Sequence, residues 1–116
     1  MTEEHHNLGV RTERDPDATI LYLNGEIDLR TSPRLRDAFL NLIEQKPAKI
    51  ILDLSEVGYI DSSGVGTIVE LKRKTARHKS KVILVALQPR VRSLFEITRL
   101  DAFFDIVETL DEARKK

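Results

Sequence analysis

The middle of the sequence, residues 49–74, combines an apolar run, a short polar region and an amphipathic pattern. Residues 50–54 are aliphatic on both faces apart from Asp53, which is typical of a strand buried between two layers. Residues 55–61 are more polar and contain a glycine, so they are predicted to form a turn region. Apolar residues then recur at helical spacing, and the predicted unit is strand, loop and helix.

Two further strands are predicted before this unit. Residues 8–12 and 18–24 have strand-like patterns, and the Pro16 region between them is typical of a turn, so an antiparallel hairpin is expected. In the second strand, Ile20 and Tyr22 should face one side of the sheet, and Leu21 and Leu23 the other. Residues 25–30 are predicted to be a loop anchored by the apolar side chains of Ile27 and Leu29.

The remaining elements follow from the same criteria. A hydroxyl residue before a proline predicts a helix starting at residues 31–33, and its single apolar stripe ends near Pro47. Residues 81–86 are predicted to be a buried strand, and residues 110–116 a short charged helix or a frayed end. A further helix should begin near Pro89, and a final short strand should follow it. The residues expected to face inward in that helix are Val91, Leu94, Phe95 and Ile97, and those expected in the strand are Phe103, Phe104 and Ile106.

This alternation of strands and helices predicts an α/β fold in one domain. We expect a mixed, mostly parallel sheet of four or five strands, with an N-terminal hairpin and about four helices packed on it. Loops at the carboxyl ends of parallel strands are where functional residues collect. Asp28 and Ser63 each follow a predicted strand, so they are expected at the same end of the sheet.

The clearest candidate for chemistry is the sequence Asp61-Ser62-Ser63-Gly64 at the start of the central helix. Aspartate and serine cap the free N–H groups of a helix, and the partial positive charge there tolerates a phosphate. Gly64 and Gly66 are poor helix formers, which suggests that another chain approaches this turn closely. From the local pattern alone, a simple helix cap after the strand-to-helix loop is the favoured interpretation of these residues.

Other site chemistries lack the residues they need. The serines are not in a G-x-S-x-G elbow, and no phosphate-binding G-x-x-x-x-G-K-[ST] motif is present. No set of bases or metal ligands accompanies the serines, so no enzymatic activity, cofactor or metal is expected. His5 and His6 are neighbours in a polar N-terminal segment and would chelate a metal poorly.

Composition narrows the classes further. The 116 residues contain 19 basic and 19 acidic side chains, so the formal net charge is zero and nucleic-acid binding is not expected. The sequence contains no cysteine, no apolar run of membrane-spanning length and no signal-peptide pattern. We therefore expect a cytoplasmic protein.

Several motifs of the chain together resemble a known family. The segment Asp53-Leu54-Ser55, then Val57, then residues 60–66 (IDSSGVG) resembles the signature of the STAS domain of bacterial anti-sigma factor antagonists. Residues 23–28 (LNGEID) and 91–95 (VRSLF) extend the resemblance, which covers residues 8 to about 112. The corresponding division is a flexible tail at residues 1–7 and a STAS domain at 8–116.

The resemblance implies a regulatory function. The unphosphorylated protein would bind an anti-sigma factor that is itself an ATP-dependent serine kinase of histidine-kinase-like fold, and so release a sigma factor. That kinase would phosphorylate the serine immediately before the glycine, which here is Ser63, and a serine phosphatase would reverse the modification. The family also places the matching aspartate, Asp28, on the partner-binding face. The residues expected on that face are Asp28, Asp61, Ser62, Ser63, Gly64, Val65 and Gly66.

Three points stay open at the level of sequence. Local physics treats Ser62 and Ser63 nearly alike, and only the resemblance favours Ser63. Arg99 stands where the family commonly has glycine, so a left-handed residue there would cost on the order of 1 kcal/mol. The alternatives in function are a scaffold STAS protein of a stress-sensing assembly and a STAS subunit of a lipid or anion transport system.

Overall fold

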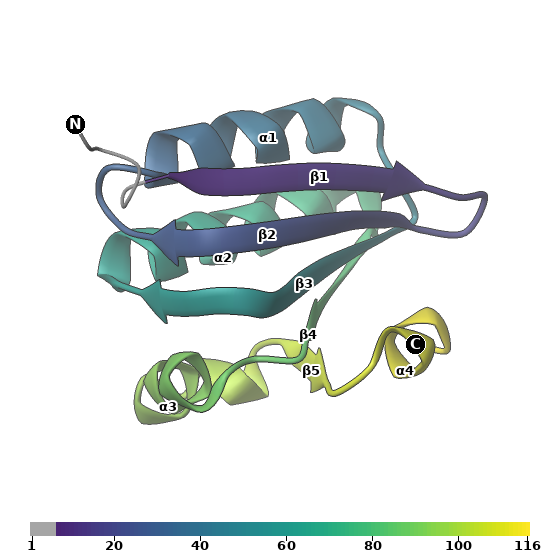
Figure 1. Ribbon diagram of the computed structural model, residues 1–116. Coiled ribbons are helices and arrows are strands. Elements are labelled where there is room, and N and C mark those ends of the chain that lie inside the picture. Colours follow the sequence, from purple (N-terminus) through teal and green to yellow (C-terminus); the bar gives the residue numbers. More distant parts are fainter. Residues whose placement is uncertain (1–6) are drawn as a thin grey trace.

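The computed structural model describes residues 7–116. These residues form a five-stranded sheet with helices on both faces (Figure 1). The strand order in the sheet is the chain order, with β1 antiparallel to β2 and all other neighbours parallel. The predicted mixed sheet, N-terminal hairpin and four helices are therefore confirmed. The elements are β1 (Leu8–Arg14), β2 (Thr19–Ile27), α1 (Ser32–Glu44), β3 (Lys49–Ile60), α2 (Ser62–Thr75), β4 (Lys81–Val85), α3 (Pro89–Ile97), β5 (Asp105–Val107) and α4 (Leu110–Arg114), with single 3₁₀ turns at Ala76–His78 and Leu100–Ala102.

The two faces of the sheet are covered unequally. Helices α1, α2 and α3 pack on one face over the main core, which contains Leu21 and Leu23 from β2 and Phe95 from α3. The short helix α4 packs on the other face, over a small cluster that includes Ile20, with Tyr22 partly buried beside it. The predicted alternation along β2 is confirmed, because each apolar side chain of this strand has a layer to pack against.

Strand β3 is longer than predicted. Residues 55–60, expected in a turn region, continue the strand to Ile60. The pairing of β3 with β2 shifts register twice, and Leu54, Val57 and Ile60 are all buried although they are three residues apart. Bulges of this kind insert extra residues, so a search for strict alternation misses the strand.

The loop before α1 also differs from the prediction. Residues 25–27 belong to β2, and Ile27 is fully buried as expected. Leu29, predicted to be a second anchor, is instead 75% exposed. The strand holds Ile27 against the core, and the chain turns outward immediately afterwards at Asp28.

The C-terminal segment contains two more corrections. Ile97, predicted to face inward, is 77% exposed because it is the last residue of α3. Phe103 and Phe104 precede β5 instead of forming it. Phe104 is nevertheless buried, and its ring meets that of Phe95 edge to face at a centroid distance of 5.8 Å. Phe104 therefore packs in the main core against Phe95 of α3, although it does not belong to a strand.

The turn after α3 has the left-handed geometry that its family position suggests. Arg99 has φ 65° and ψ 17°, a conformation that glycine adopts at lower cost. The predicted tail at residues 1–7, with His5 and His6, lies outside the described residues except for Asn7. None of the helices described in residues 7–116 is long and apolar enough to cross a bilayer.

Candidate functional site

The candidate site lies where β2 and β3 end at the same edge of the sheet. The two strands are parallel, and their last paired residues are Ile27 and Ile60. Helices α1 and α2 begin just beyond this edge (Figure 1). The loop that carries Asp28 and the first turn of α2, which carries Ser63, are therefore neighbours, and the backbone N–H of Asp61 donates to the carbonyl of Ile27 at 3.0 Å.

Asp61 caps helix α2 with its side chain. Its Oδ1 accepts hydrogen bonds from the N–H groups of Ser63 at 2.9 Å and Gly64 at 3.2 Å. The same oxygen accepts from the hydroxyl of Ser63 at 2.6 Å. The cap predicted from the sequence is thus present, and it also holds the side chain of Ser63 against the start of the helix.

The carboxylate of Asp61 also reaches the preceding loop. Burial alone would raise the pKa of this carboxyl group. Hydrogen bonds from the Ser63 hydroxyl and from the N–H groups of Gly64, Ser63 and Leu29 outweigh the burial, so the pKa lies below its usual value. Asp61 is consequently an anion at neutral pH, and one carboxylate joins the loop before α1 to the cap of α2.

Asp28 organises the loop before α1. Its Oδ1 accepts hydrogen bonds from the N–H groups of Arg30 at 2.9 Å and Thr31 at 3.2 Å. Thr31 in turn donates its hydroxyl to the carbonyl of Glu26 at 2.8 Å. The carboxylate of Asp28 therefore binds groups of its own loop. The link from Asp28 to Ser63 runs through its backbone carbonyl, which contacts the hydroxyl of Ser32.

Ser32 connects the two loops, and sequence reasoning did not identify it as a site residue. Its Oγ lies 2.9 Å from Oγ of Ser63 and 2.6 Å from the carbonyl oxygen of Asp28. Its sequence position at a helix start suggested only a capping role. No local pattern could reveal this contact, because Ser32 and Ser63 are brought together only by the pairing of β2 with β3.

The predicted site residues differ in their exposure. Ser62 and Gly66 are exposed, Ser63 is half-buried, and Gly64 and Val65 are buried. A Cβ atom at Gly64 would lie 2.5 Å from Cγ2 of Ile27, so the close neighbour of this glycine is its own chain and not a partner. A Cβ at Gly66 would meet nothing within 4 Å, so only Gly66 is open to an approaching molecule.

Comparison with known proteins gives the family. The model of the STAS domain matches residues 9–113, which is nearly the whole chain. The chain belongs to the STAS domain family. The resemblance expected from the sequence motifs is thereby confirmed.

Three relatives of this STAS domain are informative. An anti-sigma-B factor antagonist of Listeria monocytogenes is 37% identical over 97 residues, covering 83% of this chain and 82% of the relative. The crystal structure of an anti-sigma factor antagonist from Mycobacterium paratuberculosis has a TM-score of 0.88 at 25% identity, covering 99% and 97% of the two chains. The anti-sigma factor antagonist SpoIIAA in its unphosphorylated form has a TM-score of 0.79 at 25% identity, covering 90% and 92%.

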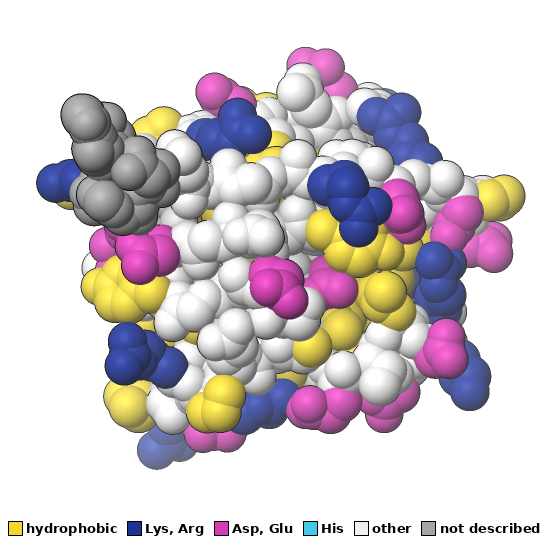
Figure 2. Space-filling model, in the orientation of Figure 1, with side chains coloured by type: hydrophobic (Ala, Val, Ile, Leu, Met, Phe, Trp, Pro, Cys, Tyr) yellow, Lys and Arg dark blue, Asp and Glu magenta, His cyan; other side chains and the backbone are white. Residues whose placement is uncertain are grey.

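Exposed apolar side chains flank the site in this STAS domain. Leu29 is 75% exposed in the loop before α1, and Tyr59 is 39% exposed near the end of β3. On the face drawn in Figure 2, basic and acidic side chains are interspersed and do not form a field of one sign. The site edge therefore offers apolar contacts close to the carboxylates of Asp28 and Asp61.

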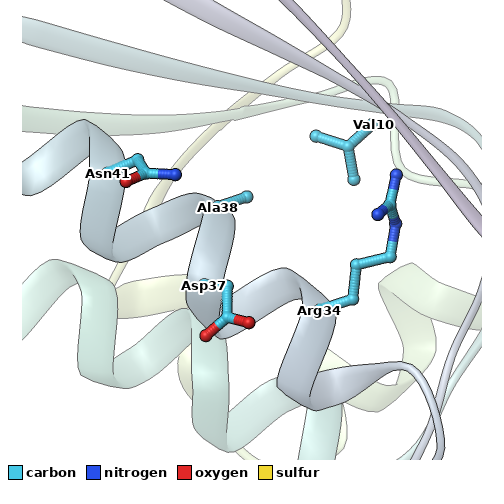
Figure 3. Close-up of a pocket in the computed structure, with 5 residues that line it drawn as sticks. All are labelled: Val10, Arg34, Asp37, Ala38 and Asn41. Atoms are coloured by element: carbon cyan, nitrogen blue, oxygen red, sulfur yellow. The ribbon is translucent and has the colours of Figure 1, made fainter.

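A separate groove lies outside this site. It is an open groove of about 430 Å³ between β1 and α1, lined by Val10, Arg34, Asp37, Ala38 and Asn41. Figure 3 shows Arg34 extending from α1 toward Val10, while the carboxylate of Asp37 points away from the strand. Within residues 7–116, no group of three His, Cys, Asp or Glu side chains is placed to hold a metal ion.

Proposed function

We propose that this STAS domain is an anti-sigma factor antagonist that acts by partner switching. In its unphosphorylated form it binds an anti-sigma factor, which is an ATP-dependent serine kinase, and thereby releases a sigma factor in the cytoplasm. The kinase phosphorylates Ser63 and ends the complex, and a serine phosphatase restores the unmodified form. The relatives described above support the antagonist role. The structure of SpoIIAA is described as that of its unphosphorylated form, which supports a role for phosphorylation.

The observation that carries this proposal is the surroundings of Ser63. Its Oγ lies 2.6 Å from the Asp61 carboxylate and one hydroxyl away from the backbone of Asp28. A phosphoryl group adds about −1.5 to −2 charge at neutral pH. That charge would be placed beside an existing anion, on a surface that offers Gly66 and Leu29 to a partner.

Phosphorylation should weaken binding through the bulk and hydration of the phosphate. A partner surface that packs closely against Ser63 leaves no room for a hydrated phosphate, which would hold the partner's groups away from Asp28 and Asp61. A loss of about 3 kcal/mol in binding free energy corresponds to more than a hundredfold in affinity. The switch thus needs no change in the fold of this domain.

The proposal is tested by capturing partners from cells of the source organism with four baits. These are the unmodified protein, Ser63→Ala, Ser63→Asp and the control Ser93→Asp, which adds the same charge at an exposed position of α3 outside the predicted partner-binding residues. The unmodified protein, Ser63→Ala and Ser93→Asp should recover an ATP-binding kinase, and Ser63→Asp should lose it. Affinities are then measured by calorimetry with the purified partner.

Two outcomes would contradict the proposal. If all four baits recover the same membrane-transport or scaffold components, Ser63 is only a structural cap in this protein. If a kinase binds every bait with equal affinity, Ser63 does not control the complex.

A further inference from the structure

The hydroxyl groups of Ser32 and Ser63 meet between the two loops of the site. Their oxygens are 2.9 Å apart, although the residues are 31 positions apart in the chain. Ser32 is only 4% exposed, so its hydroxyl has no ready access to water. This polar contact is part of the built structure, since a buried hydroxyl without partners would be costly.

The number of hydroxyl protons in this chain of contacts limits which hydrogen bonds can form at once. Three short oxygen contacts join Asp61, Ser63, Ser32 and the carbonyl of Asp28, but the two serines supply only two hydroxyl protons. The carboxylate of Asp61 is an anion and the strongest acceptor, so it takes the proton of Ser63. The hydroxyl of Ser32 then has two acceptors within reach, the Asp28 carbonyl and the Ser63 oxygen.

The carbonyl of Asp28 does not depend on the Ser32 hydroxyl. It already accepts the N–H groups of Ser32 at 2.8 Å and Thr31 at 3.2 Å. The 2.6 Å contact keeps the Ser32 hydroxyl directed at this carbonyl, and its proton can be shared with the Ser63 oxygen at 2.9 Å in a three-centre hydrogen bond. Oγ of Ser63 is then held by its own covalent bond, by Asp61 and by Ser32, and one lone pair stays free.

We propose that Ser32 is a positioning residue that fixes the Ser63 oxygen for phosphoryl transfer and so selects Ser63 over Ser62. This inference rests on the proposed function and adds to it the reason for the choice of serine. Ser62 is exposed, and within the described part of the chain its side chain makes no hydrogen bond to another residue. Its hydroxyl is therefore free to rotate, whereas that of Ser63 is held in one orientation.

The transfer step balances with these groups. The free lone pair of Ser63 Oγ forms a bond to the γ-phosphorus of ATP bound to the kinase. The bond from that phosphorus to the oxygen bridging to the β-phosphate breaks, and ADP leaves. The hydroxyl proton of Ser63 passes by way of the Asp61 carboxylate to solvent, so Asp61 is again an anion beside the new phosphate ester, and the hydroxyl of Ser32 stays a donor to that ester. Fixing a nucleophile in this way lowers the entropy cost of reaching the transition state.

The kinetic test uses Ser32→Ala, with Ser80→Ala as the matched control, because the Ser80 hydroxyl also donates to a distant backbone carbonyl, that of Pro47, but lies just before β4 and outside the site. With the captured kinase and ATP, kcat for Ser32→Ala should fall about tenfold, as expected for one lost hydrogen bond, while KM stays within about twofold. Mass spectrometry should show that the fraction of phosphate on Ser62 increases. Ser32→Thr, which restores the hydroxyl, should recover a large part of the rate, and Ser80→Ala should keep the kcat and the site selection of the unmodified protein.

A second measurement needs no kinase. The exchange of the Ser63 hydroxyl proton with water, followed by NMR at low temperature, should be about tenfold faster in Ser32→Ala. Unchanged exchange, or equal kcat and equal site selection in Ser32→Ala, overturns the role of Ser32 even if Ser63 is the switch. If instead no kinase is captured and exchange is still accelerated, the proposed function fails while the hydroxyl contact stands.

Discussion

At the scale of single residues, the two glycines at the start of α2 have opposite surroundings. A Cβ atom on Gly64 would come within 2.5 Å of Ile27 and 2.8 Å of Ile60, both of which are held in the core. A Cβ atom on Gly66 would lie in open space. Glycine at position 64 is thus required by packing, while at position 66 it costs helix stability without a structural return inside this chain.

Alanine substitutions should separate these two roles. Gly66→Ala should raise the free energy of unfolding by about 0.5–1 kcal/mol, because alanine favours the helix and meets no atom. Gly64→Ala should lower it by about 1–3 kcal/mol, because Ile27 and Ile60 must move. Urea unfolding at constant pH measures both, and a stabilised Gly64→Ala would contradict the packing.

Asp61 should make stability depend on pH at the acid end. Its pKa is lowered in the folded protein, so its contribution is complete above the unfolded-state pKa of about 3.9 and is lost as pH falls through the lower folded value. Asp61→Asn keeps a capping side chain but cannot ionise. The unmodified protein should exceed Asp61→Asn in free energy of unfolding by more at pH 7 than at pH 3, as measured by urea unfolding. An equal difference at both pH values would show that the charge of Asp61 is not involved.

At the scale of elements, the ends of the helices carry most of the deviations from ideal backbone. Among residues 7–116, four residues other than glycine have positive φ, and they lie after α1, α2 and α3 and after β4: Lys46, Lys79, Arg99 and Ala86. Each ends or follows a regular element where the chain must reverse. Glycine would be less strained at these positions, so each of the present residues lowers the free energy of unfolding relative to glycine.

Arg99→Gly should therefore stabilise the protein. The left-handed conformation at φ 65° costs an ordinary residue on the order of 1 kcal/mol, and glycine avoids part of this cost. We expect the free energy of unfolding, measured by heat or urea, to rise by about 0.5–1 kcal/mol. The greater conformational entropy of glycine in the unfolded chain offsets part of this gain. Arg99→Ala removes the same exposed side chain but keeps the strained backbone, so it should not reproduce the gain.

At the scale of the whole molecule, the sheet has a thick side and a thin side. The thick side carries three helices and the main core, whereas the only helix that the described residues place on the thin side is the five-residue α4. Strand β5 has three residues and no fully buried side chain. The C-terminal part should therefore open more readily than the centre of the sheet.

Hydrogen exchange should reveal this gradient. Amides in the middle of β3 should exchange only through global unfolding, whereas those of β5 and α4 should exchange through local opening at lower free energy. Native-state exchange at increasing urea, detected by NMR, distinguishes the two routes. Equal protection of β3 and α4 would mean that the thin side is as cooperative as the thick one.

A feature could be predicted from the sequence when it depends on residues that are close together in the chain. The strands and helices were found because alternation and helical spacing are local signals, as in Leu21 and Leu23. The end of β3 was missed because its bulges break the alternation. Asp61 was identified as a cap from its neighbours, but the role of Ser32 depends on strand pairing between distant segments, which no local pattern contains.

The placement of α4 has a practical consequence for measuring the proposed switch. Arg114 pairs with Asp15 in the β1–β2 turn, and Nζ of Lys49 donates to the carbonyl of Arg114, so α4 lies at the end of the sheet opposite Ser63. The start of β1 lies at the other end, since Nε of Arg34 in α1 donates to the carbonyl of Leu8. A fluorescent reporter or a sensor surface attached through α4 would leave Ser63 accessible to a partner, whereas a label on the exposed Asn7, just before β1, would lie beside the proposed binding edge.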